Sequence, residues 1–348
     1  MRKYFQFLSP MIAVIIIPCG LLYASGVPAQ RVRLLDHGIN MNNLMDIGNK
    51  FNSFIPEDLA KLKQMGIKNV RIVVHIGNLL PGFKTPTLKE LSIDKDVITA
   101  LNTLDKRMEE FNKAGFPMTL SLFLPDQYKK LEVEESKGLM LKAMDVLTGR
   151  YAKKYSPDQL FFDVNEPRYE PDAWNKIAPL LVESIRKNAP EHTIIIMPAK
   201  FETRNFPELK PLKDSNIIYA MHIYWPSEFT LQGQPGLSKV NPDLRFPDGK
   251  VTEEKLEANM KVGIDWAEKN KVPLIMQEFG CSNAAEPKSR LAWIKAVRRL
   301  AEKYNLPWTY WSFTGKQFGL KPKVGDAYDP CLLEALSGPA GEKERSKK

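Results

Sequence analysis

The stretch LFFDVNEP, residues 160–167, joins an apolar run to three residues that do not belong in a hydrophobic core. Its two phenylalanines and its valine are typical of a buried parallel strand that is covered on both faces. Asn165, Glu166 and Pro167 then end the run, and a proline cannot continue a central strand. We therefore predict a strand over 160–165 that carries a carboxylate at its carboxyl end.

Seven further short apolar runs predict strands, and amphipathic segments separate most of them. These runs cover residues 33–40, 68–75, 117–124, 193–199, 217–224, 273–279 and 308–313. Between the first two, apolar residues recur at helical spacing from Ile55 to Met65, and Gly66 follows as a stop. Only a weak helical segment follows 193–199, and only the short segment 329–337 remains at the end.

This alternation of strands and helices predicts an α/β fold, a single (β/α)8 TIM barrel. The alternative is a doubly wound open sheet, which usually carries a glycine-rich nucleotide-binding turn after its first strand. The sequence HGINMNN at 37–43 is no such turn. We place one barrel domain at 30–338 and a charged C-terminal tail at 339–348.

Residues 1–29 have the pattern of a secretory signal peptide. A short basic start precedes a strongly apolar run at 11–24, and Ala29 supplies a small residue before a cleavage point. The alternative is an uncleaved anchor helix, which Pro10 and Pro18 would interrupt. We expect a secreted or periplasmic protein without a stable membrane partner after cleavage, or a membrane-anchored one if the segment stays uncleaved.

The composition argues against several kinds of partner and cofactor. The 348 residues carry a formal net charge of +9, but the basic residues are widely spread and no nucleic-acid-binding motif occurs. The four histidines are far apart in sequence and no phosphate-binding glycine loop is present, so we expect no metal and no organic cofactor. We expect a monomer. Whether Cys281 and Cys331 pair stays open, because two thiols define no disulfide framework.

Polar residues gather where the predicted strands end. In a barrel these ends lie on one face and build the active site. In chain order, the candidates are Arg71, His75, Asn165, Glu166, His222, Tyr224, Glu278 and Trp311. Two carboxylates beside an arginine, a tyrosine and a flat aromatic suit glycosidic cleavage, since one carboxyl must donate a proton while the other stays ionised. Each side chain alone has a plainer role as an ion pair, core residue or helix cap, so the prediction depends on their convergence.

Alternation along the strands predicts which side chains share a face. On this basis Met276 and Glu278 lie along one side of their strand. We expect Arg71 to keep Glu278 charged and Tyr224 to donate a hydrogen bond to it. Trp311 is expected to offer a face on which a sugar ring stacks.

Four motifs resemble those of glycoside hydrolase family 5, over a span of roughly residues 33–313: DVNEP, HIYW, MQEFG and YWSF. The resemblance implies that Glu166 is the acid/base and Glu278 the nucleophile of a retaining β-glycosidase. It also implies that Asn165 holds the sugar 2-hydroxyl and that Trp311 lies at the subsite of the attacked sugar. Arg71, His222 and Tyr224 are implied to arrange the two carboxylates. A cis peptide often follows the tryptophan in this family, here between Trp311 and Ser312.

The chain departs from the family pattern at the third strand. Family members usually carry a histidine at the end of that strand, where this sequence has Phe123 and Leu124. His75, one strand earlier, is a partial substitute on this interpretation. The loops 78–96 and 225–250 are expected to line outer subsites, the second with Phe229 and Phe246.

Together these features predict a retaining endo-type β-glycosidase acting on a β-linked oligosaccharide or polysaccharide of the β-glucan or β-mannan class. Two alternatives use the same scaffold. One is a barrel that binds glycans without cleaving them. The other is a transglycosylase, whose catalytic residues would be the same.

Overall fold

The computed structural model describes residues 26–337, apart from 43, 45–53, 77–78, 80–94, 125–130, 235, 237 and 250. The apolar run of the predicted signal peptide, the tail at 339–348 and most of the loop 78–96 therefore lie outside the described residues. No helix in the described part of the chain is long and apolar enough to cross a membrane.

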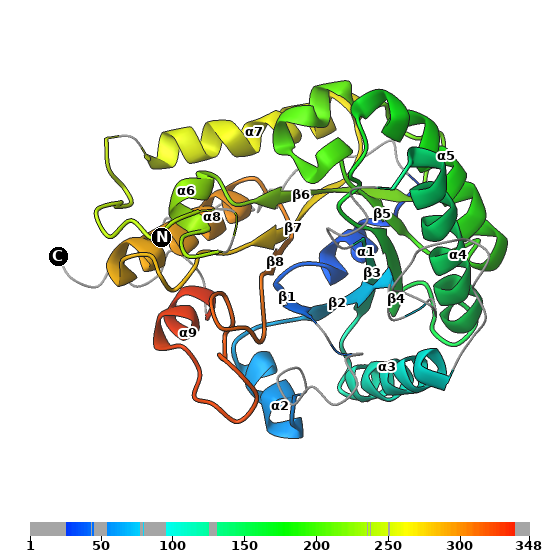
Figure 1. Cartoon of the computed structure of the whole chain (residues 1–348), viewed down its shortest axis with the longest axis horizontal. Coiled ribbons are helices and arrows are strands. Elements are labelled where there is room, and N and C mark those ends of the chain that lie inside the picture. The colour runs from blue at the N-terminus through cyan, green and yellow to red at the C-terminus, as the bar shows by residue number, and fades with distance from the viewer. Residues whose placement is uncertain are drawn as a thin grey trace, which may run out of the picture.

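Eight parallel strands close into a barrel in the order of the chain, which confirms the predicted TIM barrel (Figure 1). The strands are β1 (Gly38–Met41), β2 (Asn69–His75), β3 (Met118–Phe123), β4 (Leu160–Val164), β5 (Ile194–Ile196), β6 (Ile217–Ile223), β7 (Leu274–Phe279) and β8 (Trp308–Tyr310). The ring closes because β8 pairs with β1, Thr309 opposite Gly38. The short strand LFFDV lies between β3 and β5, as a buried parallel strand should.

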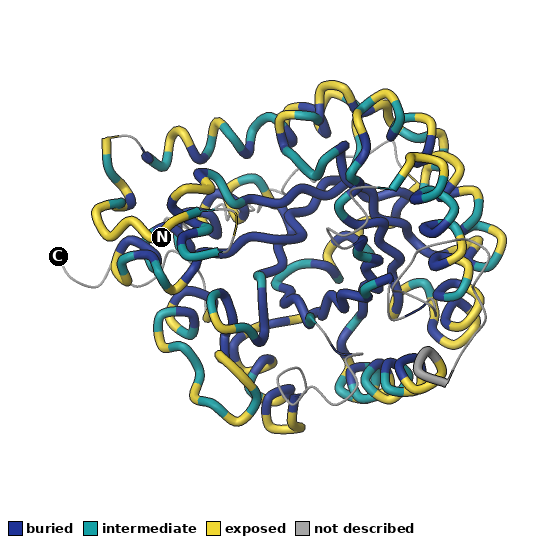
Figure 2. The backbone as a smooth tube through the Cα atoms, viewed as in Figure 1, coloured by how far each residue is buried: buried dark blue, intermediate teal, exposed yellow. Residues whose placement is uncertain are grey.

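Helices surround the strands and follow them in sequence. They are α2 (Pro56–Gln64), α3 (Lys95–Lys113), α4 (Val133–Tyr151), α5 (Pro171–Asn188), α6 (Ser227–Thr230), α7 (Glu253–Asn270), α8 (Pro287–Lys303) and α9 (Pro330–Leu336). The weak segment after β5 forms two 3₁₀ turns, η4 (Ala199–Phe201) and η5 (Thr203–Glu208). Figure 2 shows the barrel strands buried and the outward faces of the helices exposed.

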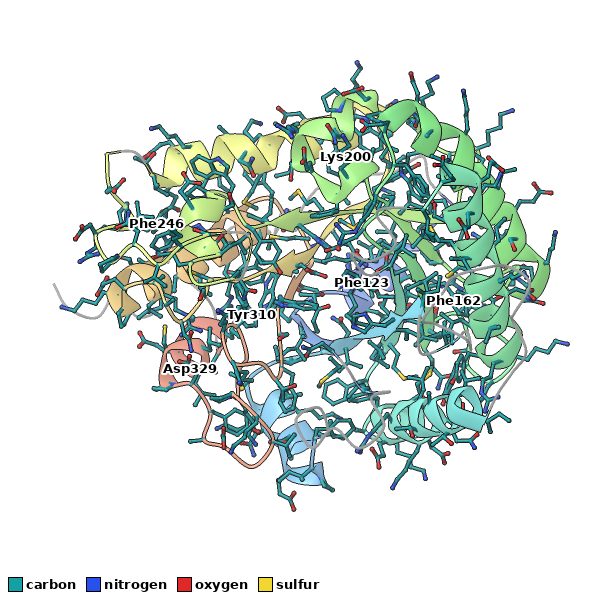
Figure 3. The ribbon with its side chains drawn as sticks, viewed as in Figure 1. Phe123, Phe162, Lys200, Phe246, Tyr310 and Asp329 are labelled. Atoms are coloured by element: carbon teal, nitrogen blue, oxygen red, sulfur yellow. The ribbon has the colours of Figure 1, made fainter. Side chains whose placement is uncertain are left out.

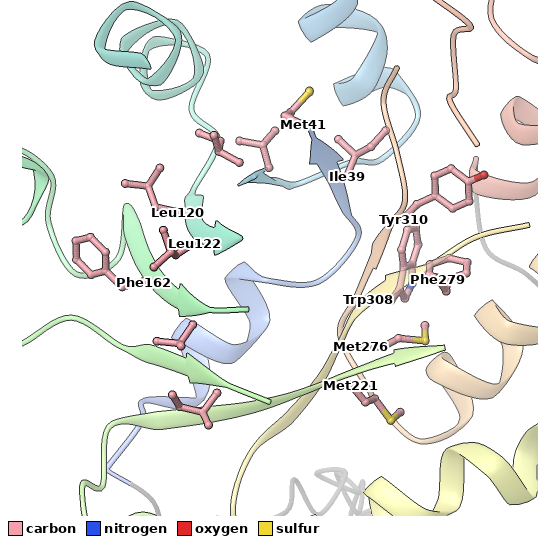
Figure 4. Close-up of a cluster of buried hydrophobic side chains, with 14 of the residues drawn as sticks. Ile39, Met41, Leu120, Leu122, Phe162, Met221, Met276, Phe279, Trp308 and Tyr310 are labelled. Carbon is pink, nitrogen blue, oxygen red and sulfur yellow. The ribbon is translucent and has the colours of Figure 1, made fainter. Parts of the chain in front are cut away.

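Successive residues of the strands serve two different cores. Phe162 belongs to the large core between strands and helices, part of which appears in Figure 4. Phe161, its neighbour, belongs to a second cluster inside the barrel, with Ile195, Ile218 and Ile275. This alternation leaves the inner face of each strand free to carry polar side chains toward the barrel mouth.

The first predicted strand is wrong at its start. Residues 33–34 belong to a helix, α1 (Ala29–Leu34), whose Val32 packs on the cluster inside the barrel. Helix α1 leads directly into β1 and so covers the amino-terminal end of the barrel, opposite the strand ends that carry the candidate site. Short apolar runs do not distinguish helix from strand by periodicity, which explains the error.

Candidate active site

The strand ends bring the two predicted catalytic carboxylates to a single histidine. Nδ1 of His222, at the end of β6, lies 3.6 Å from Oε1 of Glu166 and 3.5 Å from Oε2 of Glu278. Glu166 follows β4 with a φ of 44°, a left-handed conformation that is uncommon outside glycine and often marks a functional site. Residues far apart in sequence thus meet at the carboxyl end of the barrel.

A register shift in β7 delivers Glu278 to this point. The strand pairs Met221 with Met276 and then His222 with Glu278, so one residue of β7 is left over. Met276 consequently packs in the outer core while Glu278 faces the barrel mouth. The predicted shared face of Met276 and Glu278 is therefore wrong, because an extra residue in a strand reverses the alternation beyond it.

Arg71, on β2, holds the Glu278 carboxylate. Its Nη1 donates to Oε1 of Glu278 over 2.6 Å, and its Nε donates to Asp163 over 3.1 Å. Nη1 also donates to the side-chain oxygen of Asn40 over 2.7 Å. Burial alone would lower the pKa of Arg71, but the charges of Asp163 and Glu278 outweigh it and raise that pKa. The guanidinium is therefore a permanent cation shared by two buried carboxylates.

The sequence interpretation missed Asp163 and Asn40. Asp163 lies two residues before Asn165 and hence on the same face of β4, and its side chain is fully buried. A buried carboxylate needs a partner, so an aspartate inside an apolar run was a usable signal. Asn40 offered no comparable signal, because amides occur in many strands without a site role.

Tyr224 completes the surroundings of Glu278. Its hydroxyl donates to Oε2 of Glu278 over 3.0 Å. Burial raises the pKa of Glu278, and the contacts with Arg71 and Tyr224 offset part of that rise. Burial and the nearby Glu278 charge also raise the pKa of Tyr224 well above its usual range, so the phenol remains a donor at neutral pH.

His222 serves this site as a neutral imidazole. Burial, together with the charge of Arg71, lowers its pKa well below the usual range. Neither ring nitrogen has a hydrogen-bond partner among the described residues. The ring therefore adds no positive charge between Glu166 and Glu278.

An arginine that the sequence interpretation missed contacts the other carboxylate. Nη2 of Arg168 donates to Oε2 of Glu166 over 3.0 Å. The Arg168 guanidinium also lies over the rings of Phe123 and Phe201. His75 packs edge-on against Phe123, with ring centroids 5.0 Å apart. Figure 3 places Phe123 near the middle of the ring of strands.

The remaining predicted residues occupy the same end of the barrel. Asn165 is buried directly before Glu166, and its side-chain oxygen has no hydrogen-bond partner within the described residues. Trp311 is half-buried just beyond β8, and its peptide bond to Ser312 is cis. Both residues thus stand directly after the last residue of a barrel strand, Asn165 after β4 and Trp311 after β8.

Two expectations about the surrounding loops and thiols can be compared with the structure. Phe229 and Phe246 are buried in the outer core, so they cannot line an open subsite, contrary to the prediction. An apolar aromatic in a long loop anchors that loop when it finds a core partner. Cys281 and Cys331 are both free thiols.

The same residues could also hold a cation. Glu166, His222 and Glu278 place one possible ligand atom each within 4.8 Å of one another. The fold thus assembles a ligand set that the wide sequence spacing of the histidines did not reveal. In the structure Arg71 already pairs with Glu278, and Arg168 already pairs with Glu166.

Comparisons with known proteins describe the same kind of molecule. The chain is 25% identical over 331 residues to Endoglucanase 3 of Fibrobacter succinogenes, an alignment that covers 82% of this chain and 50% of that protein. The chain thus spans about half the length of that relative. It is 23% identical over 289 residues to Cellodextrinase A of Ruminococcus flavefaciens, covering 77% of this chain and 82% of that one.

A solved structure and a family model extend the comparison. Cellulose synthase subunit Z of Clostridioides difficile superposes with a TM-score of 0.74 at 27% identity, covering 86% of this chain and 98% of that one. The model "Cellulase (glycosyl hydrolase family 5)" matches residues 37–317, which include every strand and all the candidate residues. The chain therefore belongs to glycosyl hydrolase family 5, the cellulase family.

Proposed function

We propose that this protein is a retaining endo-type β-glycosidase that hydrolyses a β-glucan of the cellulose type. Glu278 attacks the anomeric carbon and forms a covalent glycosyl-enzyme, while Glu166 protonates the leaving oxygen. Glu166 then acts as the base that activates water, and the product keeps its β configuration.

The short distance between the carboxylates carries this proposal. One oxygen of each carboxylate and one ring nitrogen of His222 lie within 4.8 Å of one another. Retaining enzymes hold their two carboxyl groups about 5 to 5.5 Å apart, whereas inverting enzymes need about 6.5 to 9.5 Å to admit a water molecule. The proximity supports a direct attack by one of the carboxylates.

The surroundings of the carboxylates support the assignment of their roles. Glu278 accepts hydrogen bonds from Arg71 and Tyr224, which stabilise the ionised form that a nucleophile needs. Glu166 is more exposed, with 13% of its side chain accessible against 5% for Glu278, and can therefore exchange protons with water. Asn165 would hold the sugar 2-hydroxyl and Trp311 would stack on the ring.

The choice of a glucan over a mannan comes from the relatives. Their names describe an endoglucanase, a cellodextrinase and a subunit of a cellulose synthase. The endo part of the proposal comes from the relative that is named an endoglucanase.

A polysaccharide panel tests the proposal. We expect the purified protein to release reducing ends from soluble β-1,4-glucan faster than from β-mannan or xyloglucan, with an early fall in viscosity that marks internal cleavage. Proton NMR of the first products should show the β anomer. Binding without turnover of any glycan or aryl β-glycoside would instead identify a glycan-binding barrel. Longer products in place of shorter ones would identify a transglycosylase.

We also propose that the protein is exported, on the evidence of its basic and apolar start. Gly26 and Val27 lie within the predicted signal peptide, but both contact the barrel domain. The Gly26 amide donates to the Ser215 carbonyl over 2.8 Å, and Val27 is buried. Cleavage after Ala29 would remove both contacts. Sequencing the amino terminus of protein recovered from the periplasm or medium tests both export and cleavage point, and protein found only in the cytoplasm would contradict export.

A further inference from the structure

Glu166 and Arg168 form an ion pair that no motif of the sequence announced. Nη2 of Arg168 donates to Oε2 of Glu166 over 3.0 Å, and only 16% and 13% of their side chains are exposed. The two residues are only two positions apart, directly after β4. In that position a flexible arginine would ordinarily extend into water.

The rest of the site keeps Arg168 against Glu166. Its guanidinium carbon lies 5.1 Å from the ring centroid of Phe201 and 5.9 Å from that of Phe123. Its Nε donates to the carbonyl of Leu124 over 3.4 Å. Cation–π contacts and a backbone acceptor thus hold the guanidinium on two further sides.

The backbone of the 3₁₀ turn η4 supports this arrangement. Lys200 and Phe201 have φ angles of 54° and 48°, a left-handed conformation that is uncommon for residues other than glycine. The Lys200 amide donates to the Pro167 carbonyl over 2.6 Å, which ties the turn to the segment that carries Glu166. The turn directs Phe201 toward the barrel mouth, where its ring lies 6.3 Å from that of His222.

We propose that Arg168 is a positioning residue that orients Glu166 and favours its ionised form. The inference rests on the proposed function, in which Glu166 acts first as an acid and then as a base. A guanidinium beside a carboxylate stabilises the charged form. Arg168 therefore assists the second step, in which Glu166 must accept a proton, and opposes protonation before the first step.

The pH dependence of glycosylation separates this role from a structural one. The basic limb of kcat/KM reports loss of the proton that Glu166 must donate. In Arg168→Gln we expect this limb to move to higher pH by about one unit with phenyl β-cellobioside, the low end of the effect of an adjacent cation on a carboxyl group. Arg168→Lys retains a cation and should keep most of the wild-type position.

Leaving-group chemistry provides the internal control. 2,4-Dinitrophenolate leaves without a proton, so Glu166 need not donate one to it. With 2,4-dinitrophenyl β-cellobioside, Arg168→Gln should therefore not move the basic limb of kcat/KM. Arg204→Gln is the matched control variant. Arg204 also pairs with a glutamate two residues before it, Glu202, but 77% of the Arg204 side chain is exposed. We expect Arg204→Gln to behave as the wild type with both substrates.

The outcomes distinguish the two proposals. A wild-type protein that turns over neither substrate contradicts the proposed function itself. An active wild type whose Arg168→Gln variant loses activity equally at every pH, and equally with both leaving groups, overturns the role of Arg168. The same conclusion follows if the basic limb moves to lower pH.

Discussion

Arg71 and Glu278, which are 207 residues apart in the chain, form an ion pair at 2.6 Å with at most 5% of either side chain exposed. The same guanidinium contacts Asp163, so one buried cation is shared by two buried carboxylates. Charges in such a group act strongly on one another, because the surrounding medium solvates and screens them poorly. The ionisation of Glu278 therefore depends on Asp163 as well as on Arg71.

Asp163→Asn is expected to move the acidic limb of kcat/KM to lower pH. The charge of Asp163 helps to raise the pKa of Glu278, and an amide of the same shape removes that charge. A lower pKa lets Glu278 ionise, and so attack, in more acidic solution. Arg71→Gln should have the opposite sign, because it removes the cation that lowers this pKa. If the acidic limb moved in the same direction in both variants, or moved in neither, Asp163 and Arg71 would not set the pKa of Glu278 as we expect.

Tyr224→Phe is expected to reduce kcat/KM by roughly 10- to 100-fold, since a hydrogen bond to a charged group contributes about 1.5 to 3 kcal/mol. The ring keeps its edge-on contact with Phe318, so the fold should be unaffected. Tyr310→Phe is the matched control, because that hydroxyl donates over 3.0 Å to the Phe318 carbonyl instead of a carboxylate. Steady-state kinetics of both variants test the prediction, and equal losses would indicate a general packing effect.

The fold was predictable because continuous apolar runs such as LFFDV identify parallel strands, and parallel strands separated by helices have few arrangements. The site followed in part, since Glu166 and His222 stand at or just beyond strand ends. The partner of Glu166 did not follow. Its contact with Arg168 depends on left-handed backbone at Glu166 and on the position of Phe201, and neither is visible in a pattern of polar and apolar residues. The register shift in β7 that brings Glu278 to the barrel mouth is likewise not visible in that pattern.

Lys321→Met is expected to destabilise the protein by about 3 to 5 kcal/mol, the usual cost of breaking a buried ion pair. Lys321 contacts Asp58 of α2 at 2.7 Å, and at most 4% of either side chain is exposed. Among the side chains that the structure describes, Asp58 would keep the hydroxyl of Tyr328 as its one remaining donor. Urea unfolding measures the loss. Lys295→Met is the control, because its 2.7 Å pair with Glu334 is one-third to one-half exposed and should contribute at most about 1 kcal/mol.

Glu278→Ala and Glu166→Ala are expected to fail at different steps. Loss of the nucleophile should reduce turnover of aryl β-cellobiosides by roughly 10⁴-fold or more, as in other enzymes that act through a covalent intermediate. Added azide then attacks from the face that Glu278 has left and gives an α-glycosyl azide. In Glu166→Ala, 2,4-dinitrophenyl β-cellobioside still forms the glycosyl-enzyme, and azide attacks that intermediate from the opposite face to give the β-glycosyl azide. Circular dichroism of both variants controls for folding. Azide products of one anomer from both variants would mean that the two carboxylates do not divide the reaction as proposed, since the anomer records which side chain was removed.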